Sequence, residues 1–219
     1  IINMKIVYAA LLIVYVLGLS WYGGSGDPVE DAELETYIKS MARNSDARGK
    51  DSSKAAKYMR ALAARDDGNE FVMVNLIRFR GKSLYPKDSP WAEESDPMLA
   101  DARYGEGVIP LLLKRGSLPI FVSSVSGGFI NETTHAEWDT VAMVRYRSVR
   151  DMLQMMVEMS STDLADHKWA AIEQTHVFPV KPKISLVSLR LIIGIILLLF
   201  ATAVRYLVNL LKRKNSQVD

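Results

Sequence analysis

The 219-residue chain contains no cysteine. This absence excludes disulfide bonds, thiolate metal sites and cysteine nucleophiles. Histidine is scarce as well, with three in the whole chain, and the sequence has neither an H-E-x-x-H motif nor a Cys/His ligand set. The sequence therefore carries no metal or cofactor signature, and we expect no bound cofactor.

A basic surface for nucleic acid is also lacking. Residues 23–185 carry 24 acidic and 21 basic side chains, a net charge of −3, whereas the two ends together carry six basic residues and one acidic residue. A mildly acidic middle argues against nucleic-acid binding, because that function needs a basic face. Basic, apolar ends suit attachment to a lipid bilayer instead.

Residues 6–22 form an uncharged, apolar run of 17 residues. As a helix this run would be about 25 Å long, close to the hydrocarbon thickness of a bilayer. Trp21 and Tyr22 fall where an aromatic belt would lie. A cleaved signal peptide is the alternative, since Lys5 followed by an apolar run fits that pattern too. No small-x-small cleavage site follows the run, so we expect a retained transmembrane helix over residues 1–22.

Residues 184–211 contain the more strongly apolar segment, and we expect a second transmembrane helix there. Its uncharged centre covers residues 191–204. Arg190 and Arg205 flank this centre and can extend toward opposite interfaces, which brings the helix to spanning length. A helix lying on the membrane surface is the alternative, but the centre has no polar face to leave in water. Residues 212–219 follow as a basic tail.

The charges that flank the two apolar segments predict the orientation of the chain. Lys5 precedes the first segment, and five acidic residues follow it before the next basic residue, Lys39. Arg205 and the basic residues 212–214 lie at the end of the second segment. Positive charge favours the cytoplasmic side of a membrane. We therefore expect a bacterial inner-membrane protein with both termini cytoplasmic and residues 23–185 periplasmic, although basic residues just before the second segment weaken the bias.

Between the anchors, the pattern predicts a linker and helical extension over residues 23–69 and a globular domain over residues 70–183. The globular part is predicted to run strand, helix, strand, strand, helix, strand, with Ser148 as the cap of its second helix. This order is typical of a ferredoxin-like α+β fold, in which helices cover one face of an antiparallel four-stranded sheet. The expected helices are residues 29–43, 52–65, 97–116 (with a disturbed middle at 105–110), 149–159 and 162–174, and the expected strands are residues 70–80, 118–126, 137–147 and 175–180.

The predicted strand at residues 70–80 is apolar at both its odd and its even positions. Successive side chains of a strand point to opposite faces, so both faces of the sheet need a cover. Helices on one side can cover only one face. A second copy of the same sheet would cover the other, and self-association through the sheet face is therefore an expected interaction.

Short motifs within residues 70–180 carry a family resemblance. They are Val-Asn-Leu-Ile-Arg-Phe at 74–79, the helix around Tyr104, residues 112–116 ahead of a strand, Glu-Trp-Asp at 137–139 leading into Val-Arg-Tyr at 144–146, and the helix after Ser148. Together they resemble the dimeric α/β-barrel superfamily and, within it, DUF1330-type and NIPSNAP-like domains. The resemblance implies a dimer whose two sheets face each other around a barrel interior. Its relatives include cofactor-free monooxygenases and haem enzymes, but the two anchors and the helices at 29–65 lie outside the family pattern.

Three polar residues in otherwise apolar surroundings are the candidate ligand contacts: Asn75, Tyr104 and Arg145. If the barrel interior holds a small molecule, these side chains would touch it. The structural alternative is that they make hydrogen bonds between strands or between the two copies of a dimer. No catalytic or metal-binding residue is predicted, which favours a non-catalytic role and leaves enzyme activity open.

The histidines provide further candidates. His135, Glu137 and Asp139 alternate along the chain, so in an extended segment they would share one face and could bind a metal or exchange a proton. The favoured alternative to a functional site is that these are polar residues at a loop where a strand begins. His167 could ligate haem iron as in some barrel relatives, but a surface or a helix-end histidine is favoured. His176 is expected to be half-buried in the last strand.

Two classes of function remain after these observations. The leading hypothesis is an accessory or scaffolding subunit of a larger membrane complex, with the extracytoplasmic domain in contact with other subunits. The alternative is a small-molecule-binding protein or enzyme, cofactor-free oxygenase-like or haem-binding, that uses the barrel interior. A self-associating membrane organiser is a third possibility.

Four methionines lie at helical spacing: Met152, Met155, Met156 and Met159. We expect them in the core rather than on a partner surface.

Overall fold

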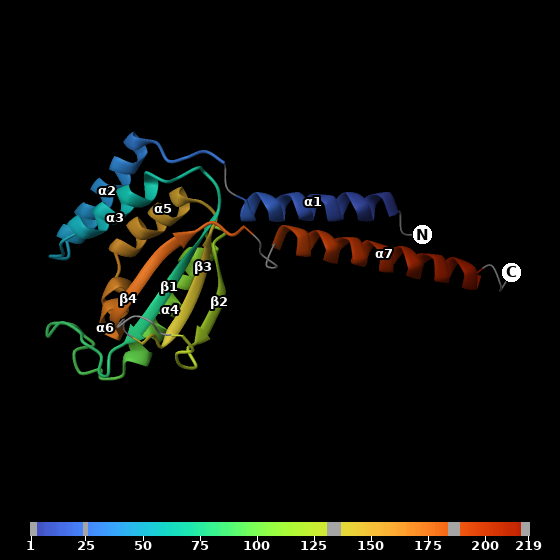
Figure 1. Ribbon diagram of the computed structural model, residues 1–219. Helices are drawn as coiled ribbons and strands as arrows, with labels where there is room; N and C mark the ends of the chain where they lie inside the picture. The colour runs from blue at the N-terminus through green and yellow to red at the C-terminus, as the bar shows by residue number, and fades with distance from the viewer. Residues whose placement is uncertain (1–3, 24–25, 131–136, 184–188, 216–219) are drawn as a thin grey trace. The chain divides into compact units, whose positions relative to one another are not determined.

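The computed structural model describes residues 4–23, 26–130, 137–183 and 189–215. The chain divides into two compact units, Gly24–Pro182 and a second unit made of both ends, Ile1–Gly23 with Lys183–Asp219. Figure 1 shows the elements of both units.

A four-stranded sheet forms the centre of the Gly24–Pro182 unit. Its strands are β1 (Phe71–Phe79), β2 (Leu118–Ser124), β3 (Thr140–Tyr146) and β4 (Ile172–Val180), in the order β2-β3-β1-β4. Every neighbouring pair is antiparallel. One helical connection follows β1 and another follows β3, so the chain has the ferredoxin-like type of α+β fold that the sequence predicts.

The helices of the unit lie on one face of this sheet. Phe71 of β1 pairs with Tyr146 of β3, and Met73 pairs with Val144. These residues pack in one hydrophobic core with residues of the helices, and Phe71 and Tyr146 stack with ring centroids 5.4 Å apart. Because side chains alternate along a strand, the intervening positions of β1 and β3 point to the opposite face. Figure 1 shows that face turned to the viewer, with no helix of the described part of the Gly24–Pro182 unit over it.

Helix α4 (Pro97–Leu113) connects β1 to β2. Pro97 stands in its first turn, and the side chain of Asp96 accepts a hydrogen bond from the N–H of Met98, as expected for a helix start. At its end, Gly116 takes a φ of +61° and the N–H of Ser117 returns to the carbonyl of Leu112. The predicted disturbance at 105–110 is absent, since α4 runs unbroken through Pro110.

Helices α5 (Val149–Ser160) and α6 (Leu164–Ala171) connect β3 to β4. Ser148 caps α5 as predicted, accepting a hydrogen bond from the N–H of Asp151. The predicted second helix of this connection was too long at its end. Residues 172–174 belong to β4, because Phe79 of β1 pairs with Ile172 and holds that segment in the sheet.

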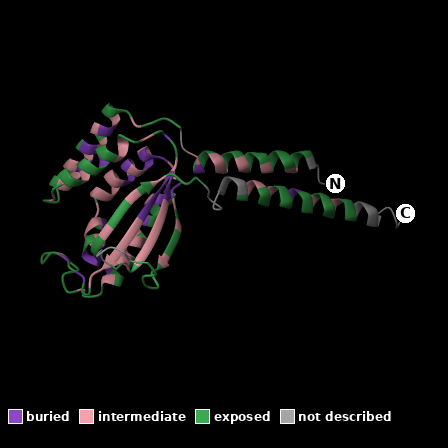
Figure 2. Ribbon diagram, in the orientation of Figure 1, coloured by how far each residue is buried: buried purple, intermediate pink, exposed green. Residues whose placement is uncertain are grey.

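The extension contributes two amphipathic helices, α2 (Asp31–Asp46) and α3 (Ser53–Ala63), whose buried residues join the same core as the sheet and α5. Arg150 of α5 donates to both carboxylate oxygens of Glu33 on α2, from Nε at 2.8 Å and from Nη2 at 3.1 Å. Figure 2 shows that each of these helices carries both buried and exposed residues. Three of the four methionines of α5 pack in this core as predicted: Met155 is buried in it, and Met152 and Met156 pack against it.

The second unit consists of two apolar helices, α1 (Met4–Tyr22) and α7 (Leu189–Asn215). They lie side by side and antiparallel, and a Cβ at Gly194 would approach the Tyr15 hydroxyl to 3.6 Å. Both helices are long and apolar enough to cross a membrane. Only 6% of each apolar window is buried, so these are not core helices of a globular domain. α7 continues to Asn215 and includes the basic cluster predicted to follow it.

Candidate functional site

The structure does not bring the three predicted ligand contacts together. Asn75 lies on the helix-covered face of the sheet, where its side-chain amide donates to the carbonyls of Met73 and Ala142 at 3.2 Å. Tyr104 also lies on that side and packs against the core. Arg145 pairs with Val72 in the sheet and therefore belongs to the opposite face. Asn75 thus makes the inter-strand bonds of the structural alternative, and a ligand role for the three residues stays a prediction.

Arg145 joins three parts of the domain. It is only 3% exposed. Its Nη1 donates to the carbonyl of Gly116 at 2.7 Å, and its Nε and Nη2 both reach a carboxylate oxygen of Glu70. A buried guanidinium needs such partners, because an unpaired buried charge is strongly destabilising. The residue therefore links the start of β1, the strand β3 and the turn after α4.

His167 is buried, which corrects the expectation of a surface position. It is 4% exposed, and its Nδ1 lies 2.7 Å from the hydroxyl of Tyr85. Its Nε2 lies 3.5 Å from a carboxylate oxygen of Asp163, one turn earlier. Trp91 contacts the imidazole edge-on, at 5.6 Å between ring centroids, and Arg103 lies over Trp91 at 4.2 Å. With both ring nitrogens facing protein groups, His167 serves to join α6 to the loop after β1.

The other histidine expectations have mixed outcomes. His176 is exposed rather than half-buried, and it contacts Phe178 edge-on at 5.2 Å. Asp139 accepts a hydrogen bond from the N–H of Phe79 at 2.7 Å, so it lies at a strand entrance. His135 lies outside the described residues, and so does the proposed grouping with Glu137. Among the described residues, no cluster of histidine and carboxylate side chains could hold a metal ion.

The face of the sheet away from the helices extends over all four strands and is largely apolar, with Ser123, Arg145 and His176 as polar members. Three of its central members, Val72, Val74 and Arg145, are nearly buried by their neighbours, whereas Phe121 on the edge strand is 49% exposed. We call this surface the open sheet face. Register and alternation place on it Leu118 and Phe121 of β2, Val141 and Met143 of β3, Val72, Val74 and Leu76 of β1, and Phe178 and Val180 of β4.

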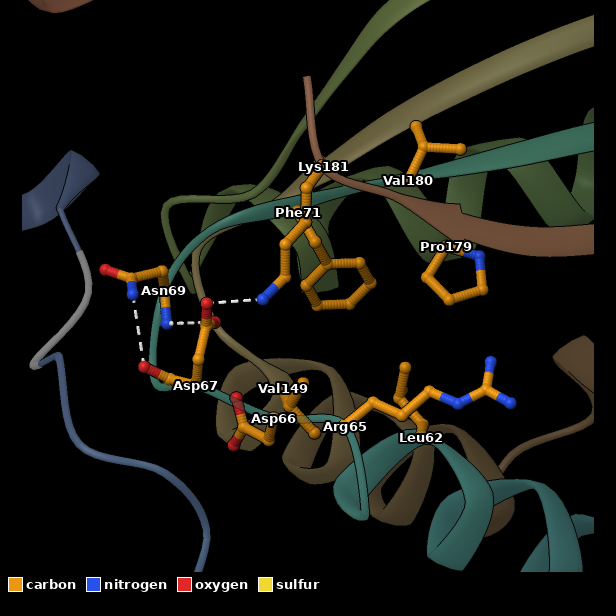
Figure 3. A pocket seen from close by; sticks show the side chains of 10 residues that line it. All are labelled: Leu62, Arg65, Asp66, Asp67, Asn69, Phe71, Val149, Pro179, Val180 and Lys181. Atoms are coloured by element: carbon orange, nitrogen blue, oxygen red, sulfur yellow. Dashed lines mark hydrogen bonds and ion pairs between the residues drawn. The ribbon is translucent and has the colours of Figure 1, made fainter. Parts of the chain in front are cut away.

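A small pocket of about 140 Å³ lies at one end of the sheet (Figure 3). We call it the junction pocket, because both ends of the Gly24–Pro182 unit meet beside it. Its wall is apolar and its rim is charged. The apolar residues are Leu62, Phe71, Val149, Pro179 and Val180, and the polar ones are Arg65, Asp66, Asp67, Asn69 and Lys181.

Two neighbouring carboxylates hold the two ends of the unit at this pocket. Asp66 accepts hydrogen bonds from the N–H groups of Val29 and Gly68, each at 2.9 Å. Asp67 forms an ion pair with Lys181, and the ammonium group of Lys181 lowers the pKa of this carboxyl below its usual range. The segment that follows α1 and the segment that precedes α7 are thus fixed to adjacent residues.

These carboxylates were not singled out from the sequence. The Asp-Gly-Asn sequence at 67–69 predicts the stop of the preceding helix, and α3 ends shortly before it, at Ala63. Its partners, Val29 and Lys181, lie 37 and 114 residues away along the chain. No periodicity or local motif signals contacts at that separation, so only the folded structure identifies them.

Comparison with known proteins gives a fold and no family. No protein-family model and no curated protein matches the chain. Among solved structures, the chain is similar to the RPA0582 protein of unknown function from Rhodopseudomonas palustris, with a TM-score of 0.51 and 23% identity over 62% of this chain and 96% of that one. The methylated RPA0582 protein gives a TM-score of 0.52 and 22% identity, over 63% and 96% of the two chains.

The likeness is one of fold. These neighbours share with the present chain an α+β architecture around a four-stranded antiparallel sheet. Both alignments include nearly the whole neighbour, yet they leave more than a third of the present chain without a counterpart. The resemblance to DUF1330-type and NIPSNAP-like domains, and the dimeric barrel that it implies, stay predictions.

Proposed function

We propose that the chain is a membrane-anchored accessory or scaffolding subunit of a larger membrane complex, and that its domain contacts other proteins through the open sheet face. The observation that carries this proposal is the combination of that apolar face with two apolar helices that no globular core covers. The two helices expose apolar side chains along most of their length, and the sheet face exposes Phe121 and leaves most of its other apolar members partly exposed. Apolar surface of this kind favours a non-aqueous partner.

The size of the open sheet face suits a protein partner. Four strands spaced about 4.8 Å apart and up to nine residues long give a flat area on the order of 500 Å², before side-chain relief is added. A standard protein interface buries about 800 Å² on each partner. The two areas are of the same order. Another copy of the chain would present an equally apolar surface, so the first partner we propose is a second protomer packed sheet against sheet.

Bilayer insertion is supported by the lengths and surfaces of α1 and α7. Their apolar windows contain 18 and 19 residues, enough for spans of about 27 Å or more. Flanking charge supports the orientation proposed from the sequence, with both termini in the cytoplasm of a bacterium and residues 23–185 in the periplasm. Arg205 and the basic end of α7 would then lie at the cytoplasmic interface.

The small-molecule alternative has less support from the geometry. The junction pocket is smaller than the roughly 300–1,000 Å³ of an ordinary ligand site. Asn75 and Arg145 lie on opposite faces of the sheet, so one bound molecule would not touch both. Protein contact is therefore the function that the described residues support best.

Gentle extraction from native membranes tests this proposal. The full-length chain is solubilised in mild detergent and separated by size, and the co-migrating proteins are identified. Migration with a defined set of other membrane proteins supports an accessory subunit. Release from the membrane by alkaline carbonate without detergent, or migration as a single chain with no partner, contradicts it.

A further inference from the structure

The junction pocket carries two cations and two carboxylates around an apolar wall. The carboxylates are already engaged, Asp66 by two backbone N–H groups and Asp67 by Lys181 and the N–H of Asn69. Arg65 differs from them. Its guanidinium makes no hydrogen bond or ion pair with any described residue, and Figure 3 shows its side chain extended along the pocket toward Pro179. The rim therefore offers a free cation to an incoming acceptor.

The lining charges also limit the class of ligand. Arg65 and Lys181 balance Asp66 and Asp67, so the rim has no net charge. A ligand that carries both charges would match it, with an anionic group against Arg65 and Lys181 and a cationic group against Asp67. Arginine binds phosphate oxygens through its planar fork of donors, which makes a phosphate the favoured anion.

Volume and wall chemistry indicate that only part of the ligand enters. A space of about 140 Å³ takes a small group rather than a drug-sized molecule. The side chains of Phe71, Val149 and Pro179 lie beside the polar rim and would contact apolar atoms next to the phosphate. A headgroup that continues into a hydrocarbon chain has this composition.

Chain connectivity places the rim near the end of α1, whatever the orientation of the domain. Gly26 contacts Gly68, since a Cβ at Gly68 would lie 2.3 Å from the carbonyl of Gly26. Only four peptide units separate Gly26 from Tyr22, where α1 ends, and they reach at most about 15 Å. If α1 spans a bilayer, this distance keeps the rim within reach of the lipid headgroups, whose layer lies outside the hydrocarbon core.

We propose that the junction pocket binds the headgroup of a zwitterionic phospholipid. The phosphate accepts hydrogen bonds from Arg65 and Lys181, and the ammonium group of the lipid faces Asp67. The inference rests on the proposed membrane anchoring, and it adds a lipid site of the domain itself to the contacts made by the helices.

Native mass spectrometry of the full-length chain tests this site. The protein in mild detergent is supplied with equal amounts of phosphatidylethanolamine and phosphatidylglycerol, and the lipid retained per chain is measured. We expect one phosphatidylethanolamine to be retained in preference to phosphatidylglycerol. In the double variant Arg65→Gln/Lys181→Gln, its affinity should fall more than tenfold, because both phosphate donors are lost. Arg65→Lys should recover part of the affinity.

A matched control removes the same amount of charge from α3, the helix that precedes Arg65. Lys54→Gln/Lys57→Gln changes two exposed residues of α3 that do not line the pocket, and it should retain the lipid as the wild type does. Circular dichroism checks that the variants are folded. If the double variant does not fold, Arg65→Gln alone serves, since the Arg65 guanidinium has no partner among the described residues.

The proposed lipid site would be contradicted if the wild type and the Arg65 variants retained equal amounts of phosphatidylethanolamine, or if the wild type retained the two lipids equally. Displacement of the lipid by excess inorganic phosphate would also contradict it, and would assign the pocket to free phosphate. These outcomes are separable from failure of the proposed function. Loss of lipid selectivity with intact co-migrating partners contradicts the lipid site alone. Lipid retention without any partner protein contradicts the accessory role alone.

Discussion

Asp66 accepts a hydrogen bond from the backbone N–H of Val29, 37 residues earlier, at 2.9 Å. The bond fixes the segment that leaves α1 to the turn between α3 and β1. The next residue, Asp67, holds the segment that leads to α7 through its ion pair with Lys181. A single turn of two carboxylates therefore fastens both connections of the domain, and its geometry depends on the glycine that follows.

Replacing Gly68 by alanine should destabilise the domain more than the same change at Gly49. Both glycines have positive φ, +75° and +66°, which costs an alanine about 1–2 kcal/mol. At Gly68 the new Cβ would also lie 2.3 Å from the backbone of Gly26, whereas at Gly49 nothing lies within 4 Å. Chemical denaturation of both variants measures the difference, and faster proteolysis near residues 26–29 should accompany Gly68→Ala. Equal losses would contradict the close approach.

Two glycines of α4 should respond in opposite directions to alanine. A Cβ at Gly107 would lie 2.1 Å from a methyl carbon of Leu164 on α6, while a Cβ at Gly105 meets nothing within 4 Å. We expect Gly107→Ala to lower the unfolding free energy by about 1–3 kcal/mol through overpacking. Gly105→Ala should raise it by up to about 1 kcal/mol, because alanine favours a helix. Thermal and chemical unfolding decide, and stabilisation by both changes would show that α4 and α6 are not in contact.

The ion pair between α2 and α5 should make stability depend on pH. Hydrogen bonds from Arg150 lower the pKa of Glu33 below its ordinary value of 4.5. The folded state then binds fewer protons than the unfolded state, so the stability from this group is complete above the unfolded pKa and is lost as the pH falls through the folded one. We expect Glu33→Gln to cost about 0.5–1 kcal/mol at pH 7 and less at pH 3.

Denaturation curves at the two pH values measure this effect. Glu30→Gln is the matched control, since Glu30 is exposed and its side chain makes no hydrogen bond or ion pair with the described residues. It should change stability little at either pH. A cost for Glu33→Gln that is the same at pH 7 and pH 3 would contradict a role for the carboxylate charge.

A charge on the open sheet face should disrupt self-association without unfolding the domain. Phe121 on the edge strand is 49% exposed, so Phe121→Glu places a carboxylate in the proposed interface at little cost to the isolated fold. Burying that charge against another sheet is unfavourable. Tyr58→Glu on α3, at 58% exposure, is the control away from that face. Cross-linking or sedimentation in detergent should show loss of the dimer for Phe121→Glu only, and equal behaviour of both variants would exclude this face.

Local patterns in the sequence predicted most of the secondary structure. A run that is apolar at both odd and even positions marked β1, and Ser148 marked the start of α5. These signals act within a few residues, which is why they can be read without a fold. The end of α6 was misplaced because residues 172–174 are fixed by pairing with β1, a contact between distant segments.

The candidate site depended far more on long-range packing. Arg145 and Asn75 looked alike as polar residues in apolar strands, yet strand register places them on opposite faces. His167 resembled a surface histidine at a helix end, but the loop after β1 covers it with Tyr85 and Trp91. Side-chain burial is set by which segments meet in space, and a single helix or strand pattern does not contain that information.

The sequence by itself determined the two apolar end segments, the order of strands and helices and the apolar character of both sheet faces, because composition and periodicity encode these directly. The tertiary structure alone decided that Asp66 and Asp67 hold both connections and that Arg65 is left without a partner among the described residues. It also decided that the described helices of the Gly24–Pro182 unit all lie on one face of the sheet. The physical reason is that hydrogen bonds and packing between residues tens of positions apart form only once the chain has folded.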